Sequence, residues 1–222
     1  MNIQANLTEV LANLPANVRL VAVSKFHPKE AIEAAYAVGQ RIFGESKVQE
    51  LQDKQQTLPK DIEWHFIGHL QTNKVKYIAP YIALIHAVDS YKLLAEINKQ
   101  AAKAGRTIPC LLEIHIAQED SKYGFTMDSC REMLSRNEWK NLEHVTIAGV
   151  MGMATNTEDN DQIYHEFNSL HEFFKELKTK YFADNNSFKE ISMGMSQDYQ
   201  LAIEAGSTLV RVGSHIFGER NY

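Results

Sequence analysis

Residues 18–46 read VRLVAVSKFHPKEAIEAAYAVGQRIFGES. The apolar run Arg19–Ser24 predicts a buried strand, and Pro28 fits the first turn of a helix with an apolar stripe. Gly39 can take the left-handed conformation that ends such a helix, and a second apolar run, Arg41–Gly44, follows at once. A strand, a helix and a second strand in this order are typical of a parallel sheet.

The same alternation continues along the whole chain. It predicts eight strands in total, at Arg19–Ser24, Arg41–Gly44, Ile62–Ile67, Ala83–Ala87, Pro109–Ile116, Val145–Val150, Phe188–Ser192 and Thr208–Val212. Helical spacing is clear at Lys92–Ala104, Asp159–Phe182 and Tyr199–Ala205, and Asn6–Leu14 predicts an extra helix before the first strand. Gly105 and Gly206 stand where two of these helices end.

Eight strands with intervening helices favour a single-domain (β/α)8 barrel of the TIM type over residues 1–222. An open, doubly wound sheet is the alternative α/β architecture. Such a sheet usually carries a glycine-rich turn after its first strand, and the corresponding turn here, Ser24–Pro28, contains no glycine. A dinucleotide-binding site is therefore not expected.

Composition excludes several classes of protein. The 222 residues include 23 Lys and Arg against 28 Asp and Glu, a net charge of −5, so nucleic-acid binding is not expected. The sequence shows neither a secretory leader nor an apolar run long enough to span a membrane. Cys110 and Cys130 are too few for a disulfide framework, which favours a cytoplasmic protein.

Chemistry in a barrel of this type is expected at the carboxyl ends of the strands. Lys25 follows the first strand directly and brings a primary amine to this face. A solvated lysine at a strand end is the commoner case. An amine among apolar neighbours can instead form a Schiff base with an aldehyde.

The last two strands are followed by small residues. Ser192–Asp198 reads SMGMSQD and predicts a turn that leads into a helix, while Gly213 and Ser214 follow strand eight. Backbone N–H groups in such turns form phosphate sites, although turn glycines and a helix cap at Ser196 would also explain the pattern. Strand eight of a closed barrel lies beside strand one, so a phosphate site would adjoin Lys25. Together they indicate pyridoxal 5′-phosphate.

Arg211 should lie near the inner end of strand eight. A buried guanidinium without a partner is costly, so this residue requires one. The nitrogen of a cofactor ring would serve.

Several segments resemble the pyridoxal phosphate homeostasis protein family (YggS/PROSC type). They are VAVSK (21–25), FGESKVQE (43–50), WHFIGHLQTNK (64–74), MGMSQD (193–198) and VRVGSHIFGER (210–220). The resemblance implies a barrel similar to the N-terminal domain of alanine racemase, with the cofactor held as an internal aldimine.

The same resemblance implies roles for individual residues. It places the Schiff base on Lys25, Arg211 near the pyridine nitrogen, and Ser196, Gly213 and Ser214 around the phosphate, with Met195 in the same cofactor-binding segment. One position departs from the family pattern, because Ser46 stands where asparagine is common. A shorter hydroxyl can still form a hydrogen bond with the cofactor.

Other polar residues are weaker candidates. His65 and His69 are four apart, but His65 belongs to a predicted strand, so a shared metal is not expected and satisfaction by neighbouring groups is the simpler interpretation. Gln71, Asn73 and Lys74 begin a helix and could contact a ligand, as could Lys122 in the loop after strand five. Met151 and Met153 are expected to pack in the core.

Three functions are compatible with these residues. The favoured one is a pyridoxal phosphate carrier, monomeric, that acts in cofactor homeostasis and possesses no robust catalysis, with apo enzymes as candidate partners. An amino-acid racemase or decarboxylase is the first alternative. A racemase needs an acid–base group on each face of the aldimine, and barrel-type racemases are expected to take one of these groups from a second domain, whereas a single-domain barrel is predicted here. An aldolase-like enzyme using Lys25 would want carboxylates beside it, and only Glu45 and Glu113 stand at strand ends.

Overall fold

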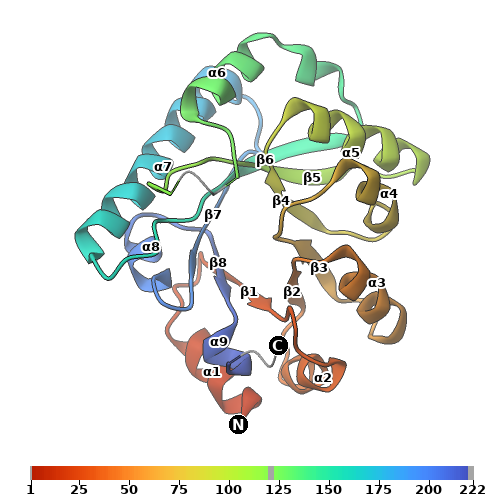
Figure 1. The fold of residues 1–222 in the computed structure, drawn as a ribbon, viewed down its shortest axis with the longest axis vertical. Helices are drawn as coiled ribbons and strands as arrows, with labels where there is room; N and C mark the ends of the chain where they lie inside the picture. The colour runs from red at the N-terminus through yellow and green to blue at the C-terminus, as the bar shows by residue number, and fades with distance from the viewer. Residues whose placement is uncertain (1, 120–122, 220–222) are drawn as a thin grey trace.

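The computed structural model describes residues 2–119 and 123–219. Within these ranges, eight parallel strands form a closed barrel in chain order, and β8 pairs with β1 (Figure 1). The strands are β1 (Arg19–Val23), β2 (Ile42–Glu45), β3 (Glu63–Phe66), β4 (Leu84–Val88), β5 (Ile108–Glu113), β6 (Val145–Met151), β7 (Glu190–Met195) and β8 (Leu209–Val212). The predicted (β/α)8 barrel is confirmed.

Helices surround the strands (Figure 1). They are α1 (Ile3–Ala12), α2 (Lys29–Ala37), α3 (Val48–Thr57), α4 (Val75–Ile78), α5 (Tyr91–Lys103), α6 (Met127–Ser135), α7 (Asn160–Tyr181), α8 (Tyr199–Glu204) and α9 (Ser214–Phe217), with 3-10 turns at Thr72–Lys74 and Glu138–Asn141. The extra N-terminal helix is confirmed as α1. It lies beside α9, where the Asn6 side chain donates to the Ile216 carbonyl at 3.2 Å.

Local signals account for the ends of several helices. Gly39, Gly105 and Gly206 have φ angles of 100°, 64° and 98°, so each takes the left-handed conformation expected after α2, α5 and α8. At the start of α7, the Asp159 side chain accepts from the N–H groups of Asp161 and Gln162.

Apolar side chains form an inner and an outer core. The outer core lies between strands and helices and includes Phe43, Trp64, Phe66 and Phe167, all buried. The inner core fills the barrel and consists of Val21, Leu84, Ala87, Leu111, Ala148, Met151 and Leu209, with Met153 packed against it. Met151 and Met153 therefore pack as predicted.

Two strands differ from the prediction by more than one residue at an end. Strand seven was expected at Phe188–Ser192, but β7 runs from Glu190 to Met195. Phe188 lies before this strand and stacks on Phe182 with ring centroids 4.1 Å apart. Most of the predicted turn after Ser192 is therefore strand. Strand five was expected to reach Ile116, but β5 ends at Glu113, whose carbonyl accepts from the N–H of Phe125 in the following loop.

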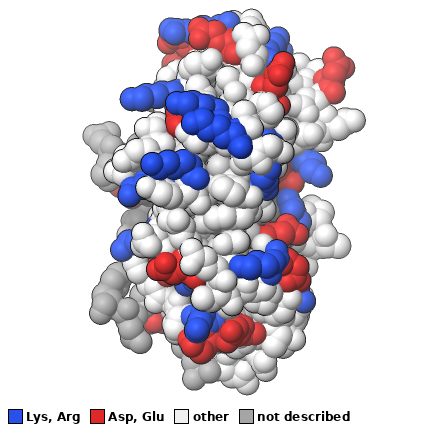
Figure 2. All heavy atoms as spheres, turned by 90° about the vertical axis from the view of Figure 1, so that its right-hand side faces the viewer, with Lys and Arg blue, Asp and Glu red and all other residues white. Residues whose placement is uncertain are grey.

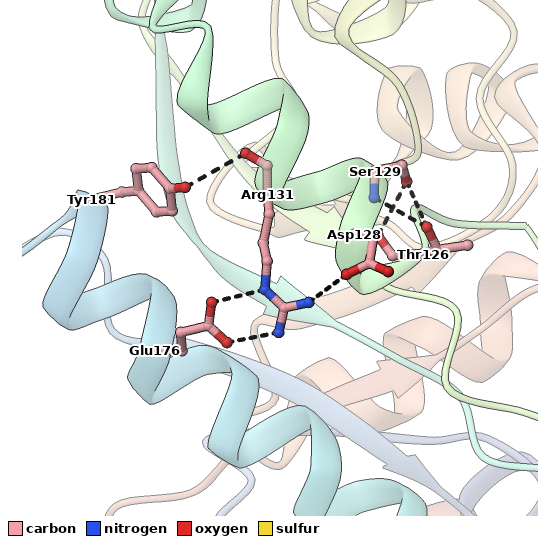
Figure 3. A network of polar contacts seen from close by, with 6 residues as sticks. All are labelled: Thr126, Asp128, Ser129, Arg131, Glu176 and Tyr181. Atoms are coloured by element: carbon pink, nitrogen blue, oxygen red, sulfur yellow. Dashed lines mark hydrogen bonds and ion pairs between the residues drawn. The ribbon is translucent and has the colours of Figure 1, made fainter.

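One polar network joins α6 to α7 (Figure 3). Arg131 of α6 donates two hydrogen bonds to Glu176 of α7, both 2.8 Å long, and a third to Asp128 at 2.7 Å. Its guanidinium also lies 5.0 Å from the ring centroid of Phe173. This arrangement fixes α6 against α7, outside the barrel.

Candidate cofactor site

A cavity of about 650 Å³ lies at the carboxyl ends of β1, β6, β7 and β8. Small-molecule sites commonly have volumes between about 300 and 1,000 Å³, so this cavity is large enough for a cofactor. Six of the seven site residues predicted from the sequence line it, namely Lys25, Met195, Ser196, Arg211, Gly213 and Ser214. Residues distant in the chain are thus brought together in one place.

Lys25 is half-buried and comes two residues after the end of β1. Ser24, directly before it, is completely buried. Phe26, directly after it, has a φ of 66°, an unusual value for an aromatic residue. The backbone around Lys25 therefore has a specific, sterically restricted conformation.

The loops after β7 and β8 are in direct contact. The backbone N–H of Gly213 donates to the hydroxyl of Ser196 at 3.1 Å. A Cβ at Gly213 would lie 3.1 Å from the carbonyl oxygen of Val23, so glycine permits the close approach of this loop to β1. The two hydroxyl groups of Ser196 and Ser214 and the Lys25 amine thus line one continuous cavity.

Arg211 is buried at the inner side of this cavity. Its guanidinium donates to the Ser192 hydroxyl at 2.7 Å and to the Gly152 carbonyl at 3.1 Å. Arg211 was predicted to require a partner, for which a cofactor ring nitrogen would serve, and the protein itself supplies two acceptors. A guanidinium has five N–H groups, so two bonds do not exhaust its donors.

Burial lowers the pKa of Arg211 to about 10, and the carboxylates of Asp198 and Glu113 partly oppose this effect. The guanidinium therefore stays charged at neutral pH and makes the cavity favourable for an anionic ligand. Asp198 itself accepts from the N–H of Met195 at 2.5 Å, which orders the turn after β7.

A chain of hydrogen bonds continues from Arg211 into the barrel. The Ser192 hydroxyl lies 2.8 Å from Nδ1 of His86, and Nε2 of His86 lies 2.9 Å from Nδ1 of His65. Burial lowers the pKa of His65 to about 3 and that of His86 well below its ordinary value, so both rings are neutral. Satisfaction of His65 by neighbouring groups is confirmed.

His65 lines a hollow at the amino-terminal side of the sheet, together with Arg19, Glu63 and Lys189, and not the cavity at the carboxyl ends of the strands. Its neighbours Trp64 and Phe66 belong to the outer core, so the alternation along β3 turns His65 inward. His69 has a different partner, Asp89, at 3.2 Å.

Ser46 is the one predicted site residue that does not line the main cavity. It lines a neighbouring hollow of about 520 Å³ with Lys47, His69, Gln71 and Lys74. Of the other weak candidates, Asn73 lines a shallower hollow beside it, and Lys122 lies outside the described residues.

Sequence reasoning missed two parts of the site. The loop after β6, residues 153–158, lines the cavity, and its polar run Thr155–Thr157 was the available signal. The second part is a buried cluster beside Lys25 formed by Glu45, Glu50 and Lys54. In the sequence, Glu50 and Lys54 form an i,i+4 pair that is typical of an exposed helix face, and Glu45 ends a strand. No local pattern therefore indicated that these three residues form a buried cluster.

On the side formed by α3, α4 and α5, the described residues carry charges of both signs. Figure 2 shows Lys and Arg interspersed with Asp and Glu among the described residues on this face. In the same described part of the chain, no helix is long and apolar enough to cross a membrane.

Comparison with known proteins places these features in context. A family model described as the alanine racemase N-terminal domain matches residues 1–221. The "Pyridoxal phosphate homeostasis protein" of Aquifex aeolicus is 38% identical over 92% of this chain and 88% of its own length. That of Haemophilus influenzae is 34% identical over 100% of this chain and 98% of its own.

Solved structures agree with these sequence relatives. PipY of Synechococcus elongatus PCC7942, solved with PLP bound, superposes with a TM-score of 0.88 at 35% identity, covering 97% of this chain and all of that one. Alanine racemase of Clostridium difficile 630 superposes with a TM-score of 0.77 at 14% identity, which supports the fold alone. This chain spans 56% of the racemase.

Proposed function

Because the chain belongs to the alanine racemase N-terminal domain family, and within it to the pyridoxal phosphate homeostasis proteins, we propose that it binds pyridoxal 5′-phosphate and stores or delivers this cofactor. The observation that carries the proposal is a single cavity lined by the Lys25 amine, the Arg211 guanidinium and the hydroxyls of Ser196 and Ser214. These groups match an aldehyde, a ring nitrogen and a phosphate.

The residues present fit the cofactor. When bound, pyridoxal phosphate supplies an aldehyde to which a lysine amine adds with loss of water. Lys25 is the candidate amine, since it lines the cavity. Ser196 and Ser214 would donate hydrogen bonds from their hydroxyl groups to the phosphate, and the backbone N–H of Gly213 holds the Ser196 hydroxyl at the cavity. Ser46 is not included, because it lines the neighbouring hollow.

We further propose that the protein is a carrier rather than a robust enzyme. Racemisation needs an acid–base group on each face of the reacting carbon. Among the described residues that line the cavity, the ionisable side chains are Lys25, Glu158, Asp198 and Arg211. Glu158 is exposed, and Asp198 is held by the N–H of Met195, so neither is placed as a buried base opposite Lys25.

An aldolase-like function receives no support from the geometry. Glu45 and Glu113, the two carboxylates considered for it, are buried and are not among the residues that line the cavity. One oxygen of Glu45 accepts from the Ser24 hydroxyl at 2.6 Å and from Lys54 at 2.7 Å. It is therefore already bonded within the protein.

Two parallel assays test the carrier function. The cofactor-loaded protein is incubated with a panel of L-amino acids in deuterated water, and exchange of the α-proton is followed by NMR. Separately, it is mixed with an apo enzyme that depends on pyridoxal phosphate, and recovery of that enzyme's activity is measured. We expect negligible exchange and efficient reactivation. Rapid exchange with inversion would identify a racemase, and failure to reactivate would exclude direct delivery.

We also propose that the carrier is a cytoplasmic monomer that meets apo enzymes transiently. The buried free thiols Cys110 and Cys130 are compatible with a reducing compartment. Sedimentation at concentrations in the micromolar range would test the oligomeric state.

A further inference from the structure

A buried ammonium group lies beside the backbone of Lys25. Lys54 of α3 is only 7% exposed. Its Nζ donates to the Ser24 carbonyl at 2.8 Å and to one carboxylate oxygen each of Glu45 and Glu50 at 2.7 Å. An ammonium group has three donors, and these three bonds use all of them.

The cluster holds the peptide groups on both sides of Lys25. On one side, Lys54 binds the carbonyl of Ser24. On the other, the N–H of Phe26 donates to Glu50 at 2.7 Å, on the same oxygen that accepts from Lys54. The φ of 66° at Phe26 is unfavourable for an aromatic residue, so the surrounding bonds must stabilise it.

Stability alone does not explain an ion cluster at this place. Taking charges out of water costs several kcal/mol per ion, and well-packed apolar residues often stabilise a protein as well as a buried ion pair does. Apolar residues cannot form hydrogen bonds with a carbonyl and an N–H group at defined positions. The geometry of the cluster is therefore suited to fixing the orientation of the backbone.

We propose that Lys54 is a positioning residue, which with Glu45 and Glu50 fixes the backbone on both sides of Lys25 and so sets the direction in which the Lys25 amine enters the cavity. The proposal rests on the proposed function, because it assumes that this amine attaches to pyridoxal phosphate. Lys54 itself does not line the cavity and would act only through Lys25.

The test compares attachment with binding. Purified wild type and Lys54→Met are mixed with pyridoxal phosphate, samples are reduced with borohydride after set times, and peptide mapping measures the adduct on Lys25. Displacement of a reacting group by about 1 Å can slow a reaction a hundredfold, so we expect attachment to slow about tenfold or more. Pyridoxine 5′-phosphate, which lacks the aldehyde, should bind both proteins with similar affinity.

Three further variants complete the experiment. Lys60→Met removes an exposed lysine just after α3 and should attach the cofactor at the wild-type rate. Glu50→Ala should slow attachment, whereas Glu50→Gln, which retains an oxygen acceptor for Phe26, should largely restore it. This pair decides the question even where Lys54→Met fails to fold.

The outcomes separate the two proposals. A wild-type protein that forms no adduct at any lysine contradicts the proposed function. A wild-type adduct on Lys25, with equal attachment rates in Lys54→Met or in Glu50→Ala, overturns the positioning role. If Lys54→Met loses pyridoxine 5′-phosphate binding to the same extent as it loses attachment, the positioning role is also overturned. The cluster would then stabilise the cavity as a whole.

Discussion

Arg211 links the cavity to the buried histidines of the barrel. Its guanidinium bonds Ser192, whose hydroxyl continues to His86 and then to His65. Because both histidines are neutral, this chain adds no second positive charge beside Arg211. Within this hydrogen-bonded chain, the guanidinium is therefore the one charged group.

Replacement of this charge should alter the spectrum of the bound cofactor. We expect Arg211→Gln to shift the absorption of the lysine-bound pyridoxal, because the electronic state of the ring depends on groups near its nitrogen. The Kd for pyridoxal phosphate should change less than about tenfold, or 1.4 kcal/mol. Absorption spectra and titrations at matched occupancy measure both. An unchanged spectrum combined with a large loss of affinity would contradict the assignment.

The two serines should confer selectivity for the phosphorylated cofactor. Hydrogen bonds to charged groups contribute about 1.5–3 kcal/mol each, so unphosphorylated pyridoxal should bind about a hundredfold more weakly than its phosphate. The double variant Ser196→Ala, Ser214→Ala should show a smaller ratio between the Kd for pyridoxal and the Kd for its phosphate. Paired titrations of the two ligands measure it, and equal affinities in the wild type would remove the basis for a phosphate site here.

Sequence reasoning brought Lys25, Arg211 and Gly213 to one place because parallel strands of a barrel bring their carboxyl ends together, and all three line the same cavity. Their roles toward a cofactor stay predictions. Lys54 was not found, because its partners come from the residue after β1, from β2 and from α3, and meet only in the folded chain. Ser46 was assigned by resemblance alone, and the structure places it in a different hollow.

Among the elements, the alternation of apolar runs predicted every strand of the described barrel, but ends of β5 and β7 were misplaced by two or three residues. Gly194 explains one of them. It has a φ of 93°, and a Cβ there would lie 2.6 Å from the Cβ of Ala202, so this glycine permits close packing of α8 on β7. From the sequence, the same small residue indicated a turn.

The contact between α6 and α7 should depend on Arg131. Loss of its bonds to Glu176 and Asp128 in Arg131→Ala should lower the free energy of unfolding by about 1 kcal/mol. For a chain of this size, that corresponds to about 2–4 °C in Tm. Arg136→Ala is the matched control, since among the ion pairs of the described residues Arg136 has one exposed i,i+4 partner, Glu132. Calorimetry that shows equal effects of the two variants would contradict this role.

Over the whole molecule, buried carboxyl groups should make stability depend on pH. Burial raises the pKa of Glu113 from 4.5 to about 7; Asp89 raises it further and Arg211 opposes the shift. The folded state therefore holds this proton more tightly than the unfolded state. The resulting stabilisation is complete below about pH 4.5 and is lost as pH rises through about 7.

A variant that cannot titrate at position 113 should differ from the wild type in Tm by an amount that depends on pH. Relative to wild type, Glu113→Gln should gain on the order of a few degrees in Tm between pH 5 and pH 8. Glu204→Gln, a substitution of the exposed last residue of α8, provides the control. A difference in Tm between Glu113→Gln and wild type that is independent of pH would show that Glu113 titrates normally.

We propose that this barrel carries pyridoxal phosphate on Lys25. The most direct measurement is mass spectrometry of the cofactor-loaded protein after borohydride reduction, with peptide mapping of the modified lysine. We predict one pyridoxyl phosphate group per chain, located on Lys25 and absent from Lys25→Ala. A group located mainly on another lysine, such as Lys74 or Lys122, or a modification that persists in Lys25→Ala, would contradict the account.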